Sequence, residues 1–258
     1  MSGIRLHVDH PLAQGQAVPL SPDQAHYLTG VMRLTVGAPV LLFNGRDGEW
    51  QASLTIAAKR GAIATCEAQT RPQTLPPDLW LLFAPIKKAR TDFIVEKAVE
   101  LGVARILPVQ TRHTNAERIR QDRLQAHAVE AAEQCGATFV PTVADLASLD
   151  RVLRDWPEGR ALLWCDETAA HATGTSSPPR GDGVGVEGTA GQAGGTSLPP
   201  APAAILNGPA GGFSAEEKQR LRTLPGVFAL SLGPRILRAD TAAVAAITLW
   251  QAARGDWQ

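Results

Sequence analysis

Hydrophobic and polar positions follow two different patterns along this chain, one in its first quarter and another afterwards. The first pattern consists of short apolar runs, rich in β-formers, that are separated by turns. Two such runs flank the segment NGRDGE, which is typical of a β-hairpin turn. The elements that this pattern predicts are a short helix beginning at Ser21 or Pro22, a hairpin over residues 38–58 and a further strand over 61–70. We therefore expect a small β-barrel or meander over residues 1–72.

The second pattern begins after the proline-rich segment 71–78 and alternates strands with helices. Residues 79–86, LWLLFAPI, are almost wholly apolar, as in a strand that is buried on both faces. The next segment has apolar residues at helical spacing and ends at Gly102, a typical C-cap. The pattern predicts further strands over 104–111, 161–167, 203–208 and 228–233, with helices over 89–102, 122–136, 214–226 and 240–255. Such alternation predicts an α/β domain over residues 73–258, with helices on both faces of a parallel sheet.

One segment interrupts this alternation. Residues 167–203 are dominated by Gly, Pro, Ser, Thr and Ala, and Leu198 is their one leucine. Such a composition buries too little apolar surface to offset the entropy of ordering, so we expect a disordered insertion.

Composition narrows the class of protein. The 258 residues carry 25 basic and 25 acidic side chains, which argues against nucleic-acid binding through bulk charge but leaves room for local basic patches. Two segments, 85–97 and 112–123, are locally basic. No apolar run is long enough to cross a membrane, the N-terminus lacks the pattern of a secretory signal, and three scattered cysteines offer no metal site. We expect a cytoplasmic protein without membrane or metal partners.

A glycine-rich loop follows the predicted strand 203–208. In ILNGPAGGFSAEEK, three glycines allow the backbone to approach a ligand closely, and Ser214 with Glu217 forms a capping box that starts a helix. The loop lacks the lysine of a phosphate-binding Walker loop and the spacing of a dinucleotide fingerprint. A second loop of this kind, SLGPRILRADTA, follows the next strand. Two such loops after successive parallel strands predict a shared ligand site.

At these residues the chain resembles a known family. GPAGGFS…E, SLGPRILRADTA, EKAVELGV and AAEQC occur in the order and approximate spacing of the RsmE-type 16S rRNA uridine N3-methyltransferases of the SPOUT class. The N-terminal segment HYLTGVMRLTVGAPVLLFNGRDGEWQASL is similar to the PUA-like β-barrel of that family. The resemblance covers nearly the whole chain except the insertion.

The resemblance implies a SPOUT domain with a C-terminal trefoil knot, preceded by an RNA-binding barrel. It also implies S-adenosyl-L-methionine as methyl donor, a homodimer, and 16S rRNA in the 30S subunit as substrate. Carried over by motif, the donor pocket comprises Leu206, Asn207, Gly208, Gly211, Gly212, Leu232, Gly233, Ile236 and Leu237. Arg33, Lys87, Lys88 and Arg90 are the candidates for holding RNA phosphates.

Methyl transfer to N3 of uracil needs correct positioning, removal of the N3 proton and stabilisation of the resulting anion. Arg235 and Arg238, beside the second glycine loop, are the candidate catalytic residues, although either could simply pair with Asp240 or a helix end. The base stays open, with Glu100 and Asp240 as options.

The sequence departs from the family pattern in its charges. Ala210 stands where the family usually has glutamate, Ala137 where it usually has arginine, and Asp240 where it usually has glutamate. The first two losses suggest that one ion pair has been removed as a unit. Two other functions stay open: a catalytically weak paralogue that binds rRNA as an assembly factor, and a SPOUT methyltransferase for another RNA position, such as a ribose 2′-hydroxyl or transfer RNA.

Overall fold

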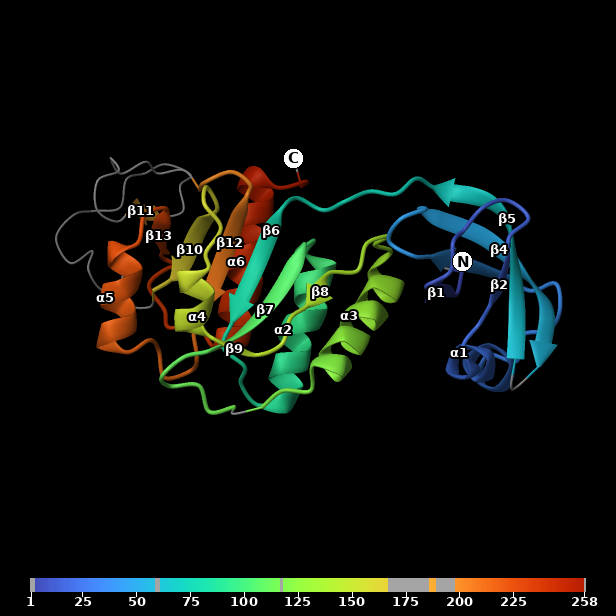
Figure 1. The fold of residues 1–258 in the computed structure, drawn as a ribbon, viewed down its shortest axis with the longest axis horizontal. Coiled ribbons are helices and arrows are strands. Elements are labelled where there is room, and N and C mark those ends of the chain that lie inside the picture. Colours follow the sequence, from blue (N-terminus) through green and yellow to red (C-terminus); the bar gives the residue numbers. More distant parts are fainter. Residues whose placement is uncertain (1–2, 59–60, 117, 167–185, 189–197, 258) are drawn as a thin grey trace. The chain divides into compact units, whose positions relative to one another are not determined.

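The computed structural model describes residues 3–58, 61–116, 118–166, 186–188 and 198–257 (Figure 1). Its contacts divide the chain into two compact units. The first unit combines Met1–Leu75 with Val129–Val140, and the second combines Pro76–Ala128 with Pro141–Gln258. Helix α3 (Gln121–Cys135) contributes residues to both units.

The first unit contains a five-stranded sheet in the order β1-β3-β4-β5-β2. β1 pairs with β3 in parallel, and the other neighbours are antiparallel. Its elements are β1 (Arg5–His7), β2 (Ala17–Pro19), α1 (Pro22–His26), a π-helical turn (Tyr27–Val31), β3 (Pro39–Phe43), β4 (Glu49–Ala58) and β5 (Gly61–Arg71). The sequence predicted the hairpin, the strand after it and the start of α1, where Ser21 and Gln24 form a capping box.

Alternation along the strands explains the core of this unit. Every second side chain is buried over residues 52–54 of β4 and 62–66 of β5, and these side chains meet apolar residues of β3 and the short helices. Leu28, Leu42 and Leu54 are fully buried there. The side chains between the buried positions of these two strands are half-buried on the other face, so the period of two specifies which face of the sheet is covered.

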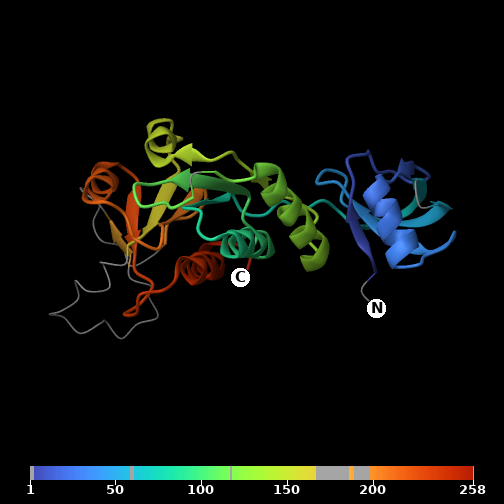
Figure 2. The same ribbon diagram turned by 90° about the horizontal axis from the view of Figure 1, so that it is seen from below.

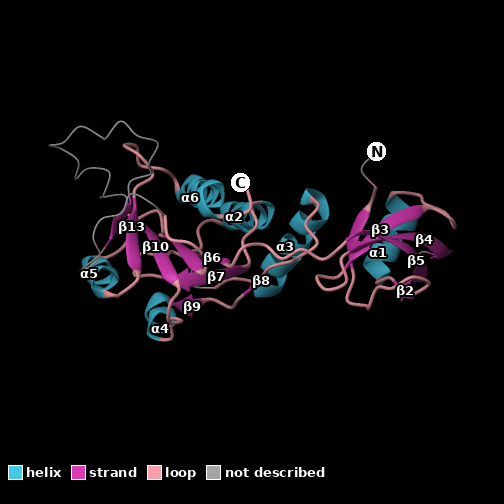
Figure 3. Ribbon diagram, turned by 90° about the horizontal axis from the view of Figure 1, so that it is seen from above, coloured by secondary structure: helices cyan, strands magenta, loops and turns pink. Residues whose placement is uncertain are grey.

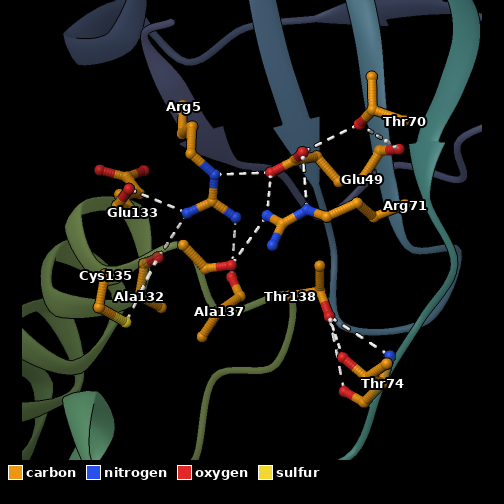
Figure 4. A network of polar contacts seen from close by, with 11 residues as sticks. Arg5, Glu49, Thr70, Arg71, Thr74, Ala132, Glu133, Cys135, Ala137 and Thr138 are labelled. Atoms are coloured by element: carbon orange, nitrogen blue, oxygen red, sulfur yellow. Dashed lines mark hydrogen bonds and ion pairs between the residues drawn. The ribbon is translucent and has the colours of Figure 1, made fainter. Parts of the chain in front are cut away.

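The end of α3 is held in the first unit by two arginines (Figure 4). Arg5 donates to the carbonyl oxygens of Ala132, Glu133 and Ala137, and Arg71 donates to that of Gly136. The carboxylate of Glu49, whose side chain is 5% exposed, lies 2.6 Å from both guanidinium groups. The last carbonyls of a helix have no partner within it, and the two cations satisfy them here.

The second unit is an α/β layer structure. Its sheet runs in the order β11-β13-β10-β12-β6-β7-β8, and all pairs are parallel except β11 with β13. The strands are β6 (Leu79–Phe83), β7 (Arg105–Gln110), β8 (Thr142–Val143), β10 (Ala161–Cys165), β11 (Val186–Gly188), β12 (Ala203–Asn207) and β13 (Val227–Leu230), and β9 (Ala147–Ser148) pairs with β7 outside this order. Every residue of β12 is buried, which fits its central place.

Helices cover both faces of this sheet (Figures 2 and 3). α2 (Lys88–Glu100) and α6 (Ala239–Arg254) lie side by side on one face, and α4 (Leu149–Arg154) and α5 (Ala215–Thr223) lie on the other. The side-chain amide of Gln251 in α6 donates to the carbonyls of Leu101 and Gly102 at the end of α2. Gly102 has a φ of 74°, as expected for a C-cap glycine. A Cβ there would lie 2.8 Å from the Gln251 amide nitrogen, so the glycine also leaves space for the hydrogen bonds of this amide.

The α/β fold expected for this part of the chain is confirmed, and each helix and strand predicted in it is present within a few residues. No element is predicted between residues 137 and 160, where the structure has β8, β9 and α4. The trefoil knot stays a prediction.

Most of the expected insertion, residues 167–185 and 189–197, lies outside the described residues. Its last part is packed: Leu198 is buried, its carbonyl accepts from Arg254, and the carbonyl of Pro199 accepts from Trp250. Among the described residues, no helix is long and apolar enough to cross a membrane. In the same residues no cluster of three or more His, Cys, Asp or Glu side chains could hold a metal ion.

Candidate functional site

A cavity of about 690 Å³ lies in the second unit, where the parallel strands end. Its walls come from the loops that follow β6, β7, β10, β12 and β13. Ligands of open α/β sheets bind at this edge, and the volume is in the range of small-molecule sites, about 300–1,000 Å³. The lining residues include Ile86, Lys87, Arg90, His113, Asn115, Cys165, Asp166, Asn207, Gly208, Ala210, Gly212, Lys218, Leu232, Gly233, Arg235, Ile236, Leu237 and Arg238.

The first glycine loop owes its shape to packing behind it. A Cβ on Gly208 would lie 2.6 Å from the ring of Phe213, which is buried and meets Trp164 edge-on at 5.9 Å between centroids. Gly212 has a φ of 69° and closes a turn onto the carbonyl of Pro209. The loop therefore needs glycine at 208 for the core beneath it, besides any close approach to a ligand.

The two glycine loops are tied to one another. The side-chain amide of Asn207, at the end of β12, donates to the carbonyl of Ala239 at 2.9 Å, and this residue is the first of α6. Asn207 is almost fully buried, so its hydrogen bond satisfies an amide that water does not reach. Its role in the structure is to hold the end of the second loop beside the first.

The second loop presents apolar and cationic side chains to the cavity. Gly233 has a φ of 96°, a conformation that other residues rarely adopt. Ile236 is 71% exposed although it is a large apolar residue, and Leu232 and Leu237 are half-buried beside it. Arg235 and Arg238 are exposed, and among the described residues no carboxylate lies within ion-pair distance of either guanidinium.

The opposite wall is formed by the loops after β6 and β7. Arg90, a predicted phosphate ligand, lies 3.6 Å from Asp240 across the start of α6. The loop after β7 is fixed to the first glycine loop, because Glu217 accepts from the amide of Arg112 and His113 Nδ1 lies 3.1 Å from the carbonyl oxygen of Gly212. Glu217 thus has two partners, since it also completes the expected capping box of α5.

Two ionisable residues at the end of β10, Cys165 and Asp166, line the cavity. Burial raises the pKa of the Cys165 thiol to about 12, so it is un-ionised at neutral pH. Asp166 is buried, with Lys218 at 3.9 Å and Arg222 at 3.7 Å from its carboxylate. Both cations belong to α5, so this carboxylate is paired with that helix.

The structure brings most of the predicted site residues together. Asn207, Gly208, Gly212, Leu232, Gly233, Arg235, Ile236, Leu237, Arg238, Lys87 and Arg90 all line the cavity. Leu206, Gly211 and Lys88 are not part of its lining, and the side chain of Leu206 packs in the core. Arg33 lies in the first unit, where it has a φ of 56°. Of the two options for the base, Glu100 pairs with Lys97 and Asp240 with Arg90, and neither lines the cavity.

The sequence reasoning missed four polar residues of the cavity: His113, Asn115, Asp166 and Lys218. His113 and Asn115 lie within four residues of the end of the predicted strand 104–111, and Asp166 lies at the end of the predicted strand 161–167, so the rule that ligands gather at carboxyl ends of strands could have found them. His113 was noted only as part of a basic segment.

The first two of the three departures from the family pattern, at positions 210 and 137, lie in different units. Ala210 is exposed and lines the cavity, whereas Ala137 lies in the first unit with its carbonyl bound to Arg5. The hypothesis that an ion pair was removed as a unit stays a prediction. Because position 210 is exposed, we expect an Ala210→Glu variant to change stability by no more than about 0.5 kcal/mol in denaturant unfolding.

Comparisons with known proteins identify the family of this chain. Residues 73–251 match the RNA methyltransferase domain, and residues 20–65 match the RNA methyltransferase PUA domain. The chain is 28% identical over 244 residues to ribosomal RNA small subunit methyltransferase E of Rickettsia conorii, covering 94% of this chain and 93% of the relative. It is 30% identical over 234 residues to the protein of the same name from Synechocystis, covering 89% and 71%.

Two solved structures are similar over almost their whole length. One is ribosomal RNA small subunit methyltransferase E from Neisseria gonorrhoeae bound to S-adenosyl methionine, with a TM-score of 0.81, 27% identity and coverage of 99% of this chain and 100% of that chain. The other is a methyltransferase from Legionella pneumophila in complex with the same cofactor, with a TM-score of 0.80, 29% identity and coverage of 99% and 100%.

Proposed function

The chain belongs to the RNA methyltransferase family, and from this premise we propose that it methylates N3 of a uridine in the 16S rRNA of the small ribosomal subunit. The activity itself is S-adenosylmethionine-dependent methylation of ribosomal RNA. The atom, the nucleotide and the assembly into a homodimer that acts in the cytoplasm are parts of the proposal.

The cavity between the two glycine loops carries this proposal, because it fits the methyl donor. Leu232, Leu237 and the exposed Ile236 offer apolar surface that an adenine ring would cover. The backbone of Gly208 lines the same cavity and offers amide and carbonyl groups to the polar parts of the donor. When bound there, S-adenosylmethionine supplies an electrophilic methyl group on a positively charged sulfur.

The residues of this chain would position the uracil and its charge. Arg235 and Arg238 lie at the cavity without carboxylate partners among the described residues, so either guanidinium is available to an oxygen of the uracil. A positive group beside O2 or O4 stabilises the anion that forms when N3 loses its proton. Lys87, Lys88 and Arg90 follow β6 and would hold phosphates of the RNA, with Arg33 of the first unit contributing a further contact.

A methylation assay tests the function. Undermethylated 30S subunits are incubated with tritiated donor, and the modified nucleotide is then mapped by mass spectrometry. We expect incorporation into 16S rRNA as N3-methyluridine. A Gly233→Val variant is the control, because a side chain at φ 96° strains the loop by about 1–2 kcal/mol and disturbs the donor pocket. Incorporation by the wild type no greater than by this variant would contradict the enzymatic function.

Donor binding separates the enzyme from a catalytically inactive rRNA-binding paralogue. Isothermal titration of the wild type with S-adenosylmethionine is expected to give saturable binding that Gly233→Val weakens at least about tenfold, equivalent to about 1.4 kcal/mol. RNA binding without measurable donor binding would instead favour an assembly factor.

A further inference from the structure

The proposed reaction needs a group that accepts the N3 proton, and the cavity offers few candidates. Among the described lining residues, the proton-accepting side chains are Cys165, Asp166 and His113. The pKa of Cys165 is raised to about 12 by burial, which leaves the thiol protonated at neutral pH. Asp166 is buried with Lys218 and Arg222 beside its carboxylate. His113 is exposed at the cavity wall, so a substrate can reach it.

The orientation of His113 is fixed by the donor loop. Its Nδ1 lies 3.1 Å from the carbonyl oxygen of Gly212, and a carbonyl only accepts hydrogen bonds, so Nδ1 carries a proton. In the neutral ring, Nε2 then holds the free lone pair. A Cβ on Gly211 would lie 3.4 Å from the Cβ of His113, so the two loops are in close contact here. The histidine is thus held against the loop that would bind the methyl donor.

We propose that His113 is the general base of the methyl transfer, with Nε2 accepting the N3 proton of the target uracil; this inference rests on the proposed function. The N3–H bond breaks and its electron pair stays on N3. N3 then forms a bond to the methyl carbon while the carbon–sulfur bond breaks and its electrons pass to sulfur. The products are N3-methyluridine, S-adenosylhomocysteine and a protonated His113, which returns its proton to solvent.

Charged groups of both signs lie near His113. Arg112 precedes it, and Glu216 and Glu217 begin the helix that follows the glycine loop. The pKa of Glu216 is lowered by hydrogen bonds from its own backbone amide and from Ser214, and further by Arg112 and His113, so this carboxylate is charged near neutral pH. Glu216 is therefore an anion within electrostatic reach of His113, and the protonated ring that the reaction produces has this negative charge nearby, while the cations of the cavity (Lys87, Arg90, Lys218, Arg235 and Arg238) share the same lining.

His113→Asn is the decisive variant, because its side-chain amide keeps a donor for the Gly212 carbonyl and has no basic nitrogen in place of Nε2. Single-turnover methylation is measured at saturating donor with 30S subunits, over a range of pH. We expect the rate at neutral pH to fall about 10²- to 10⁴-fold, the usual contribution of a general base. The rate of the variant should rise about tenfold per pH unit until N3 itself ionises, where it approaches the wild type.

Two further variants distinguish a general base from other roles of His113. His113→Gln, which extends towards the position of Nε2 without basicity, should be equally slow, and His10→Asn, at an exposed position of the first unit, should keep the wild-type rate. Calorimetry with S-adenosylmethionine should give both His113 variants the donor affinity of the wild type.

The possible results distinguish a failure of this proposal from a failure of the proposed function. If the wild type forms N3-methyluridine and His113→Asn matches it within about threefold at neutral pH, the base lies elsewhere, since a general base contributes far more. If the variant loses donor affinity but reaches the wild-type rate at saturation, His113 only supports the loop, and the proposal is wrong. A wild type that methylates another atom overturns both the proposed function and this role.

Discussion

Gly208→Ala is expected to destabilise the second unit and to weaken methyl-donor binding, although it adds only one methyl group. The new Cβ would lie 2.6 Å from Cε2 of Phe213, a separation that real Cβ atoms essentially never show. The Phe213 ring is buried and packs edge-on against Trp164, so it has little room to move. Overpacking of this kind costs about 1–3 kcal/mol of unfolding free energy.

A double-mutant cycle checks the cause. Phe213→Leu is combined with Gly208→Ala, and each variant is measured by denaturant unfolding and by calorimetry with S-adenosylmethionine. If the ring is the obstacle, the two substitutions together cost less than the sum of their separate costs, by at least about 0.5 kcal/mol. Gly211→Ala is the matched control for stability, because its Cβ would meet only ordinary contact at 3.4 Å. Strict additivity would contradict the packing role of Gly208.

Glu49→Gln is expected to cost about 3–5 kcal/mol of unfolding free energy at neutral pH, the usual effect of breaking a buried ion pair. The substitution keeps the shape of the side chain but leaves Arg5, whose side chain is 8% exposed, without its countercharge. Arg71 loses the same partner. Both arginines hold the end of α3 in the first unit, so we expect protection of the α3 amides from hydrogen exchange to fall with global stability.

The effect of Glu49 should depend on pH in a defined direction. Burial alone would raise the pKa of its carboxyl, but hydrogen bonds from Arg71, Arg5 and Thr70 outweigh burial and lower the pKa from 4.5 to about 2. The ionised form therefore stabilises the fold above the ordinary pKa, and this contribution is lost as the pH falls towards 2. At about 1.4 kcal/mol per pKa unit, the gap between wild type and Glu49→Gln should narrow by about 2 kcal/mol between pH 7 and pH 3.

Glu67→Gln serves as the control for this titration. Glu67 is exposed on β5, and its substitution should change stability by less than about 0.5 kcal/mol at either pH. Denaturant unfolding of the full chain at pH 7 and pH 3 measures all three proteins. A Glu49→Gln variant as stable as Glu67→Gln at pH 7 would show that the network in Figure 4 contributes no net stability.

The elements of the fold could be predicted because their signals are local. Runs rich in β-formers marked β4 and β5, an unbroken apolar run marked β6, and the capping residues Ser21 and Ser214 marked two helix starts that the structure confirms. The segment around α4 lacked such a signal, because its six residues bury only Leu149 and Leu153 against the sheet. The order of the strands was also beyond local reasoning, since β12 lies between β10 and β6 through pairings across long stretches of chain.

The candidate site was partly predictable for a similar reason. Both glycine loops carry their signal in sequence, and both line the cavity. The ion-pair partners of the charged residues have no such signal in the sequence. The sequence allowed Asp240 to pair with Arg235 or Arg238, whereas in the structure it lies beside Arg90 of another helix. His113 was equally hidden, because only the contact with Gly212 distinguishes it from other residues of a basic segment.

The sequence by itself determined the class of fold, the two glycine loops and the resemblance to a methyltransferase family, because hydrophobic period, capping and loop motifs are written in consecutive residues. Only the tertiary structure decided that Gly208 makes room for Phe213, that Glu49 joins the two arginines that hold the end of α3, and that His113 lines the cavity with Nδ1 beside the carbonyl of Gly212. The physical reason is the distance along the sequence over which each kind of interaction acts. A backbone preference acts over a few residues, whereas hydrogen bonds, ion pairs and steric contacts join residues that only folding brings within a few ångströms.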